Sequence, residues 1–368
     1  MMPPADPIAA VTHPDPYPYY ADLVARRPFH RDETLGLWVA ASAAAVSATL
    51  TSPLGRVRPA AEPVPRALVG SPAGEIFGQL VRMNDGATHA QHKPAVAARV
   101  ATLAPARIVE QADAWAQRLV AELAPRSDSS ALAAFGFRLP VYTIASLLGV
   151  PAVEVVHTEQ WVGEFVRSLA PTSTPAQVEA GKEAAGRLIA QFLALLGRDK
   201  LDVTVANTIG YLSQAYEATA GLIGNSLLAL GREPAIRTRI GSDARLLGAV
   251  VREVVRHDPP VQNTRRFVAE AGTIGGQTVK AGEAVLVVLA AANRDPAVNP
   301  DPARFDPLRR ERQSFTFGLG AHACPGEALA SSIAERGVAQ LLAAGVEPAA
   351  LLERVRYRPS GNTRVPMF

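Results

Sequence analysis

The feature that most constrains the fold is a proline-free, apolar stretch in the middle of the chain, from about Asp202 to Leu230. Its residues favour a helix, and apolar side chains occupy almost every side of that helix. A helix without a polar face belongs in the middle of a large core, not on its rim. Residues 74–260 around it show apolar spacings of three and four, so we predict a mainly α-helical chain.

Prolines divide this helical region into separate elements. Breaks are expected near Pro105, Pro125, Pro140 and Pro151, because proline interrupts the hydrogen bonding of a helix interior. The segment "APTSTP" at 170–175 predicts a loop between two helices.

After Pro259 the pattern changes from helix to strand. The segments "TRRFVA", "GTIGGQTVKAG" and "EAVLVVLAAAN" predict short strands joined by glycine turns, and "EALASSIAERGVAQLLAAG" predicts a helix that ends at Gly345. Proline-rich segments at 1–18 and 53–72 are expected to be irregular. We therefore predict one domain over 1–368, mainly α with a minor β component, with an irregular N-terminal extension at 1–15.

Composition excludes several classes of function. The formal charge is only +3 and the basic residues are dispersed, so no nucleic-acid partner is expected. A single cysteine excludes a disulfide framework and a multi-cysteine zinc site, and it favours a reducing compartment. The N-terminus lacks the pattern of a signal peptide, and no uncharged apolar stretch approaches the roughly 18 residues of a membrane span. We expect a cytoplasmic protein without a membrane partner.

That single cysteine, Cys324, lies in the glycine-rich segment "FGLGAHACPG", residues 317–326. Three interpretations compete. Most free cysteines are small buried hydrophobic residues. The segment "GLGAHA" also fits a dinucleotide-binding fingerprint, but that fingerprint needs an acidic residue about 20 positions later, and residue 343 is alanine. The third interpretation makes Cys324 a thiolate ligand of a metal.

The surrounding residues favour the thiolate. Pro325 suits the first position of the following helix, which places Cys324 at a helix N-terminus where free N–H groups stabilise an anion. Gly318, Gly320 and Gly326 let the backbone pass close to a flat ligand, and Phe317 supplies an apolar wall. One thiolate without a second protein ligand at metal spacing suits haem iron better than zinc.

These ten residues resemble the haem-binding loop of the cytochrome P450 superfamily, F-G-x-G-x-H-x-C-x-G, at every fixed position. The resemblance extends from about residue 15 to 368. It implies the single-domain cytochrome P450 fold of the soluble bacterial class, which is α-rich, with a long central oxygen-binding helix and small β-sheets. It also implies haem b as the cofactor and Cys324 as the axial ligand of its iron.

A porphyrin carries two propionates, which need cationic or hydrogen-bonding partners. The segment "MNDGATHAQHK" resembles a helix motif of the family that ends H-x-x-x-R, with His89 and Lys93 at the two positions. Lysine in place of arginine provides a point charge instead of a bidentate fork. Arg266 and His322 match two further positions that contact the propionates in the family. Without the family context, His89 could equally lie on a solvated helix surface.

The segment "EVVR" places Glu253 and Arg256 on one helical face, where they can pair. Such pairs are common, but this one resembles the family's E-x-x-R helix. In the family these two residues form a buried network with an arginine of the proline-rich segment, and "FDPLR" makes Arg309 that third partner. Buried charges of this kind are tolerable only when they satisfy one another.

The central helix departs from the family at the oxygen-binding motif, which usually reads A-G-x-E/D-T-T. Aligning "LIGN" places residues 214–218, "QAYEA", on that motif. The acid is present as Glu217, and the small residue is Ala215. The alcohol position is Ala218, and Thr219 lies one place later, about 100° around the helix.

A methyl group cannot deliver protons, which is a task for a general acid. Glu217 with water, Gln214 or Tyr216 could take the role of the alcohol, or the substrate could bring its own hydroxyl. Alternatively, the enzyme uses peroxide or catalyses a coupling or rearrangement in place of hydroxylation. A ligand-binding relative that no longer activates oxygen is the third possibility.

The resemblance implies a haem-thiolate monooxygenase that uses dioxygen to oxidise a small apolar organic molecule, in bacterial secondary metabolism or catabolism. Electrons would come from a separate ferredoxin and its reductase. We expect that partner to dock near the cysteine, where Arg309, Arg310 and Arg312 could meet acidic groups. The protein is expected to be a monomer.

Overall fold

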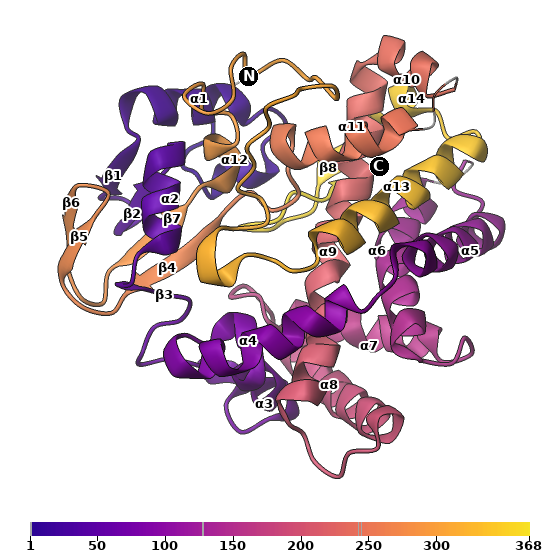
Figure 1. Cartoon of the computed structure of the whole chain (residues 1–368), viewed down its shortest axis with the longest axis horizontal. Helices are drawn as coiled ribbons and strands as arrows, with labels where there is room; N and C mark the ends of the chain where they lie inside the picture. The colour runs from indigo at the N-terminus through magenta and orange to yellow at the C-terminus, as the bar shows by residue number, and fades with distance from the viewer. Residues whose placement is uncertain (1, 127–128, 242, 244) are drawn as a thin grey trace.

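The computed structural model describes residues 2–126, 129–241, 243 and 245–368. Most strands lie on the left of the view in Figure 1 and most helices on the right, and helix α9 (Val203–Arg232) runs between them through the middle of the molecule. Helices α6 (Ser129–Leu148), α7 (Val155–Ser168), α8 (Pro175–Leu196) and α13 (Glu327–Ala343) pack against α9. The predicted central helix is confirmed.

The remaining elements complete an α-rich fold with small sheets. The other helices are α1 (Tyr17–Arg26), α2 (Ala43–Thr51), α3 (Pro72–Gln79), α4 (Gly86–Ala101), α5 (Pro105–Leu123), α10 (Pro234–Ile240), α11 (Arg245–His257), α12 (Leu289–Ala292) and α14 (Pro348–Leu351), with 3₁₀ turns η1 (Ala9–Thr12), η2 (Arg66–Leu68), η3 (Val81–Met83) and η4 (Gly320–His322). The strands are β1 (Phe29–Asp32), β2 (Leu37–Ala40), β3 (Gly55–Arg56), β4 (Thr264–Val268), β5 (Gly272–Ile274), β6 (Gln277–Val279), β7 (Ala284–Val287), β8 (Arg356–Tyr357) and β9 (Pro366–Met367).

Helix α9 begins where the sequence supplies a cap. The carboxylate of Asp202 accepts hydrogen bonds from the backbone N–H groups of Thr204 and Val205, both at 2.9 Å, which satisfies two free donors of the first turn. Further along, Gly221 lets the C-terminal segment approach, because a Cβ there would lie 2.8 Å from the carbonyl oxygen of Arg364. The helix is therefore buried along most of its length.

The main sheet has five strands in the order β1-β2-β7-β4-β3. Strand β7 pairs antiparallel with β4, with Arg266 opposite Val285, and parallel with β2, with Trp38 opposite Val285. The strands predicted after Pro259 are confirmed, although "EAVLVVLAAAN" ends as helix α12. The sequence analysis did not predict β1 and β2.

Two further local predictions need correction. Pro140 lies inside α6 and does not break it, whereas Pro105, Pro125, Pro151 and the segment 170–175 do mark helix ends. The N-terminal segment, of which residue 1 is outside the described residues, contains η1, and the buried guanidinium of Arg364 donates to the carbonyl oxygens of residues 11, 13 and 14. These bonds hold the expected irregular extension against the domain.

One stretch, Ser130–Leu148 in α6, is long and apolar enough to cross a membrane by length and composition. Within the protein, 67% of that stretch is buried, and α6 packs against α5, α7 and α9. This burial is the behaviour of a core helix.

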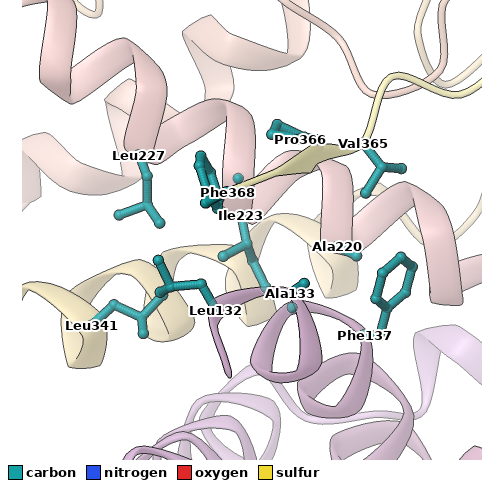
Figure 2. Close-up of a pocket in the computed structure, with 12 residues that line it drawn as sticks. Leu132, Ala133, Phe137, Ala220, Ile223, Leu227, Leu341, Val365, Pro366 and Phe368 are labelled. Carbon is teal, nitrogen blue, oxygen red and sulfur yellow. The ribbon is translucent and has the colours of Figure 1, made fainter. Parts of the chain in front are cut away.

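A small apolar pocket lies between α6, α9, α13 and the C-terminal segment. Figure 2 shows Pro366 and Phe368 of that segment beside Ile223 and Leu227 of α9. Its interior volume of about 10 Å³ holds at most one water. We treat this pocket as a packing defect of the core and not as a ligand site.

Candidate functional site

The loop before α13 has a backbone that requires glycine. Gly318 and Gly320 have φ values of 75° and 70°, in the left-handed region that other residues rarely adopt. The backbone N–H of Cys324 donates to the carbonyl oxygen of Phe317 at 2.8 Å, which closes the loop. The loop therefore presents the Cys324 side chain at a fixed position.

The Cys324 sulfur is accessible and accepts a hydrogen bond from the backbone N–H of Gly326 at 3.3 Å. Burial raises the pKa of the Cys324 thiol, while that N–H group and the charges of Lys93 and Arg82 act to lower it. Helix α13 begins at Glu327, so Pro325 precedes the helix and does not occupy its first position, as the sequence analysis had placed it. The sulfur still lies at the helix N-terminus, where an anion is stabilised.

Helix α4 brings His89 and Lys93 to this loop. The ring of His89 lies 4.2 Å from the ring of His322, measured between centroids, and Lys93 Nζ donates to the carbonyl oxygen of Ala323 at 2.7 Å. His322 Nε2 lies 3.1 Å from Asp85 Oδ1. Segments that are more than 200 residues apart in the sequence thus meet beside Cys324.

This cluster carries more positive than negative groups. Burial lowers the pKa of His89, and the charges of His322 and Lys93 lower it further. Burial also lowers the pKa of Arg266, with Asp85 acting in the opposite direction. Although burial alone would raise the pKa of Asp85, hydrogen bonds from His322 and from the backbone of residue 57 hold it below its usual value. The carboxylate of Asp85 therefore accepts hydrogen bonds from both His322 and the backbone N–H of Val57.

His89 Nε2 is buried and is among the polar atoms without a hydrogen-bond partner in the described part of the chain. A buried donor of this kind normally has an acceptor. Two carboxylates placed among His89, Lys93, Arg266 and His322 would supply the missing acceptors. The residues present therefore fit a porphyrin: Cys324 would hold its iron, and groups of α4 and β4 would pair with its propionates.

Arg82, in η3, was missed by the sequence analysis. Its side chain is accessible, yet burial of the surrounding site lowers its pKa to about 10, and the charge of Cys324 acts to raise it. In the sequence it is a lone arginine directly before the segment "MNDGATHAQHK", and no spacing pattern connects it to the cysteine. Its charge acts on the same sulfur as that of Lys93.

Behind the loop, a buried ion network joins α11 to the proline-rich segment. Glu253 Oε1 lies 2.6 Å from Arg256 Nη2, and both side chains are 0% exposed. Arg309 Nε lies 3.6 Å from Glu253, but Arg312 Nε is closer at 2.8 Å and donates to Glu253 Oε2. The nearer third partner is thus Arg312. Arg309 and Arg312 both turn toward Glu253, whereas Arg310 is exposed.

The five polar or small side chains proposed on α9 point in different directions. Gln214 is exposed and Ala218 half-buried, although the helix around them is mostly buried. They lie one turn apart and so share a face. Gln214 Nε2 donates to the carbonyl oxygen of Gly210 at 2.8 Å, which leaves its amide oxygen available. Thr219 is 1% exposed and its hydroxyl has no hydrogen-bond partner in the described part of the chain.

Glu217 faces the C-terminal strands. Its carboxylate lies 2.6 Å from Arg358 Nη1 and accepts a hydrogen bond from Thr363 Oγ1 at 3.0 Å. The guanidinium of Arg358 also lies over the ring of Phe137, 5.5 Å from its centroid. The acid of the motif is therefore held by partners from the end of the chain.

Tyr216 points to another side of α9, into a cavity of about 310 Å³ between α6, α7 and α9. Burial raises the pKa of Tyr216 to about 12, and the charge of Glu159 adds to the effect. Gly163 makes room for the phenol, because a Cβ there would lie 2.8 Å from the Tyr216 oxygen. Tyr216 and Ala218 thus lie on different faces of the helix.

Comparison with known proteins identifies the family. The model of the family "Cytochrome P450" matches residues 203–344, from α9 through α13. The cytochrome P450 monooxygenase PikC of Streptomyces venezuelae is 30% identical over 355 residues, which are 89% of this chain and 83% of the relative. The chain belongs to the cytochrome P450 family.

Other comparisons agree with this assignment over different lengths. The biotin biosynthesis cytochrome P450 of Bacillus subtilis (strain 168) is 31% identical over 229 residues, 56% of this chain and 58% of that relative, so that match spans less than two thirds of the relative. The crystal structure of P450BioI in complex with hexadec-9Z-enoic acid ligated acyl carrier protein superposes with a TM-score of 0.79, at 24% identity and 96% coverage of both chains. This superposition confirms the fold.

Members of the family bind haem b, and haem b is the cofactor of this chain. The accessible sulfur of Cys324 and the unpaired nitrogen of His89 are the features of the structure that fit it.

Proposed function

We propose that the protein is a monooxygenase that inserts one oxygen atom of dioxygen into a small, largely apolar organic molecule. The second oxygen atom leaves as water, which requires two electrons and two protons. A separate ferredoxin with its reductase would supply the electrons, and the reaction would belong to bacterial secondary metabolism or catabolism in the cytoplasm. The observation that carries this proposal is the accessible Cys324, held at the N-terminus of α13 beside a cluster of cationic and imidazole side chains that could pair with propionates.

When bound, haem would supply the oxygen chemistry, and the Cys324 thiolate would hold its iron and donate electron density to it. The chain holds the group in place through the cations of α4 and β4. Glu253, Arg256 and Arg312 fix the segment that leads to the cysteine loop, since Glu253 also accepts the backbone N–H of Asp306 at 3.1 Å. A rigid loop keeps the sulfur at one position through turnover.

Proton delivery is the step in which this chain differs from the family pattern. Tyr216 faces the cavity beside α7, and the carboxylate of Glu217 is held by Arg358 and Thr363. Gln214 lies on the same face as Ala218 and keeps its amide oxygen available. We infer that Gln214 orients a water beside Ala218, and that this water takes the place of the family's alcohol.

Cys324→Ser tests the thiolate. The wild-type protein is expected to show the red-shifted Soret band of the reduced CO complex, because that shift requires a sulfur anion on the iron. The Cys324→Ser variant should lose the band. Thr51→Ser, on an exposed side chain at the end of α2, is a control that should keep it. A band that persists in Cys324→Ser would exclude this residue as the ligand.

Gln214→Leu tests the water. Relative to wild type, this variant should release more peroxide per electron pair consumed. Leucine cannot hold the proposed water beside Ala218, so that water would no longer pass protons to the oxygen. Leakage equal to wild type would contradict the role of Gln214.

A second candidate is a peroxide-driven oxygenation or coupling reaction, favoured by the methyl group of Ala218 at the alcohol position. Peroxide already carries the electrons and protons, so the missing alcohol would matter less. Turnover with peroxide alone, at rates equal to those with ferredoxin and reductase, would favour this candidate. Failure of both routes to consume any substrate would favour a ligand-binding role.

A further inference from the structure

The cavity of about 310 Å³ beside Tyr216 lies outside the cluster around Cys324, and the residues that line it come from α6, α7 and α9. Two of them, Val156 and Gln160, are exposed and mark its mouth, whereas Gly163 and Tyr216 are buried and mark its inner end. Pockets that bind small organic molecules begin at about 300 Å³. The cavity is therefore large enough for a small molecule.

Two arginines belong to the lining of this cavity. Arg138 comes from α6 and Arg167 from α7, and both are half-buried. Within the described part of the chain, neither guanidinium forms a hydrogen bond or a close ion pair. Both are therefore available to an anion that enters the cavity.

Gly163 lets two hydrogen-bond donors meet at the inner end. A Cβ at this position would lie 2.8 Å from the Tyr216 oxygen and 3.3 Å from Arg167 Nη1. Burial raises the pKa of Tyr216 to about 12, so the phenol keeps its hydrogen at neutral pH. A guanidinium and a phenol, both donors, therefore lie close together over Gly163.

The charges of the lining do not balance. Glu159 is the one carboxylate among its described residues, against the guanidinium groups of Arg138 and Arg167. Burial raises the pKa of Glu159, and the charges of both arginines act to lower it, so the three groups influence one another. Glu164 lies outside the lining and accepts a hydrogen bond from Gln160 Nε2 at 3.3 Å. With Glu159 ionised, one positive charge is left over, which a ligand with a single negative charge would neutralise.

The cavity is separate from the haem-binding residues. Tyr216 and Ala218 are two residues apart on α9, so their side chains point about 200° apart around the helix. The groups that fit the propionates lie at α4, β4 and the cysteine loop, and none of them lines the cavity. A ligand bound beside Tyr216 would therefore not occupy the space beside Ala218.

We propose that this cavity is a second ligand site, which binds a small organic molecule with one carboxylate. Arg167 donates two parallel hydrogen bonds to that carboxylate, since the fork of a guanidinium matches the geometry of its two oxygens. The phenol of Tyr216 donates from the inner end, and Arg138 adds its charge. The site does not depend on the oxygen chemistry, because its lining shares no residue with the cluster around Cys324.

The test uses purified haem-loaded protein and pairs of ligands that differ in charge. Acetate, lactate and benzoate are each compared with acetamide, lactamide and benzamide by isothermal titration calorimetry, at constant ionic strength. Wild type is expected to bind at least one carboxylate about 10-fold more tightly than its amide, as is typical of charge-assisted hydrogen bonds. Carboxylates that bind no better than their amides would overturn the proposal.

Variants then assign the binding to the cavity. Arg138→Gln and Arg167→Gln should each weaken carboxylate binding about 10-fold, and the second variant remains informative if the first folds poorly. Arg187→Gln, at an exposed position of α8 outside the lining, is the matched control and should behave as wild type. Unchanged affinity in the cavity variants would contradict the assignment.

Glu159→Gln should have an effect of the opposite sign. This variant removes the negative charge of the lining, so it should bind the carboxylate about threefold more tightly than wild type, or better. Damage to the packing of the cavity would weaken binding instead. Equal or weaker binding in Glu159→Gln would therefore exclude a carboxylate as the ligand.

Imidazole distinguishes the cavity from the space beside the iron. It is a nitrogen ligand of haem iron, and in excess it occupies that space. The affinity for the carboxylate, again measured by calorimetry, should be the same with and without saturating imidazole. Loss of binding in its presence would place the carboxylate beside the haem and refute a second site.

Discussion

His257 provides a prediction whose size follows from the structure. It ends α11, next to Arg256, and connects the ion network to the proline-rich segment. Its Nδ1 lies 2.9 Å from Arg294 Nη2 and its Nε2 lies 2.9 Å from the carbonyl oxygen of Ala303. Because arginine only donates, Nδ1 must accept and Nε2 must carry the hydrogen. The folded protein therefore holds the imidazole neutral.

Burial lowers the pKa of His257 to about 3, and the charge of Arg294 acts in the same direction. In the unfolded chain this pKa is about 6.5, so between these values the unfolded state binds one more proton and stability falls as the pH falls. Each pH unit below about 6.5 costs about 1.4 kcal/mol, which gives about 2 kcal/mol at about pH 5.

His257→Gln isolates this contribution, because the amide oxygen can accept from Arg294 while the amide nitrogen donates to Ala303. The free energy of unfolding in urea is measured at about pH 7.5 and about pH 5 for both proteins. Wild type should lose about 2 kcal/mol more than the variant over this interval. His157→Gln, at an exposed position, should lose as much as wild type. Equal losses in wild type and His257→Gln would refute the reasoning.

Two further predictions concern packing and charge near the site. Gly163→Ala should lower the free energy of unfolding by about 1–3 kcal/mol, because the new Cβ would lie 2.8 Å from the Tyr216 oxygen, and adding Tyr216→Phe should recover most of the loss in thermal denaturation. Arg312→Ala should cost about 1.5–3 kcal/mol, because it removes a charged hydrogen bond to the buried Glu253. Arg310→Ala, which is exposed, should change stability by at most about 0.5 kcal/mol, and equal effects of the two arginine variants would contradict the network.

The parts of the fold that the sequence predicted are those set by local chemistry. The composition of residues 202–230 favours a buried helix, and the left-handed backbone at Gly318 and Gly320 requires glycine. Pro140 shows the limit of such rules. Tertiary packing of α6 against α5, α7, α9 and α13 tolerates a proline that an isolated helix would not.

Contacts between distant segments could not be predicted in the same way. The proline-rich segment offers Arg309 and Arg312 three residues apart, and both reach Glu253, so a sequence match alone selected the farther one. Arg82 was missed because no spacing rule connects it to Cys324. Its position depends on the hydrogen bond between Val81 and Asn207, which are more than 100 residues apart.

The oxygen-binding motif shows why an alignment can identify positions and still leave the mechanism open. Neighbouring residues on a helix differ by about 100° in direction, so five adjacent candidates must face several environments. Here Tyr216 faces a cavity beside α7, Glu217 is held by Arg358, which lies 141 residues further along the chain, and Gln214 shares the face of Ala218. The carboxylate of Glu217 is occupied by Arg358 and Thr363 and does not lie free beside Ala218. Ala218 has no hydroxyl to pass protons, and the Glu217 carboxylate is paired elsewhere. Both features favour proton transfer through a water oriented by Gln214.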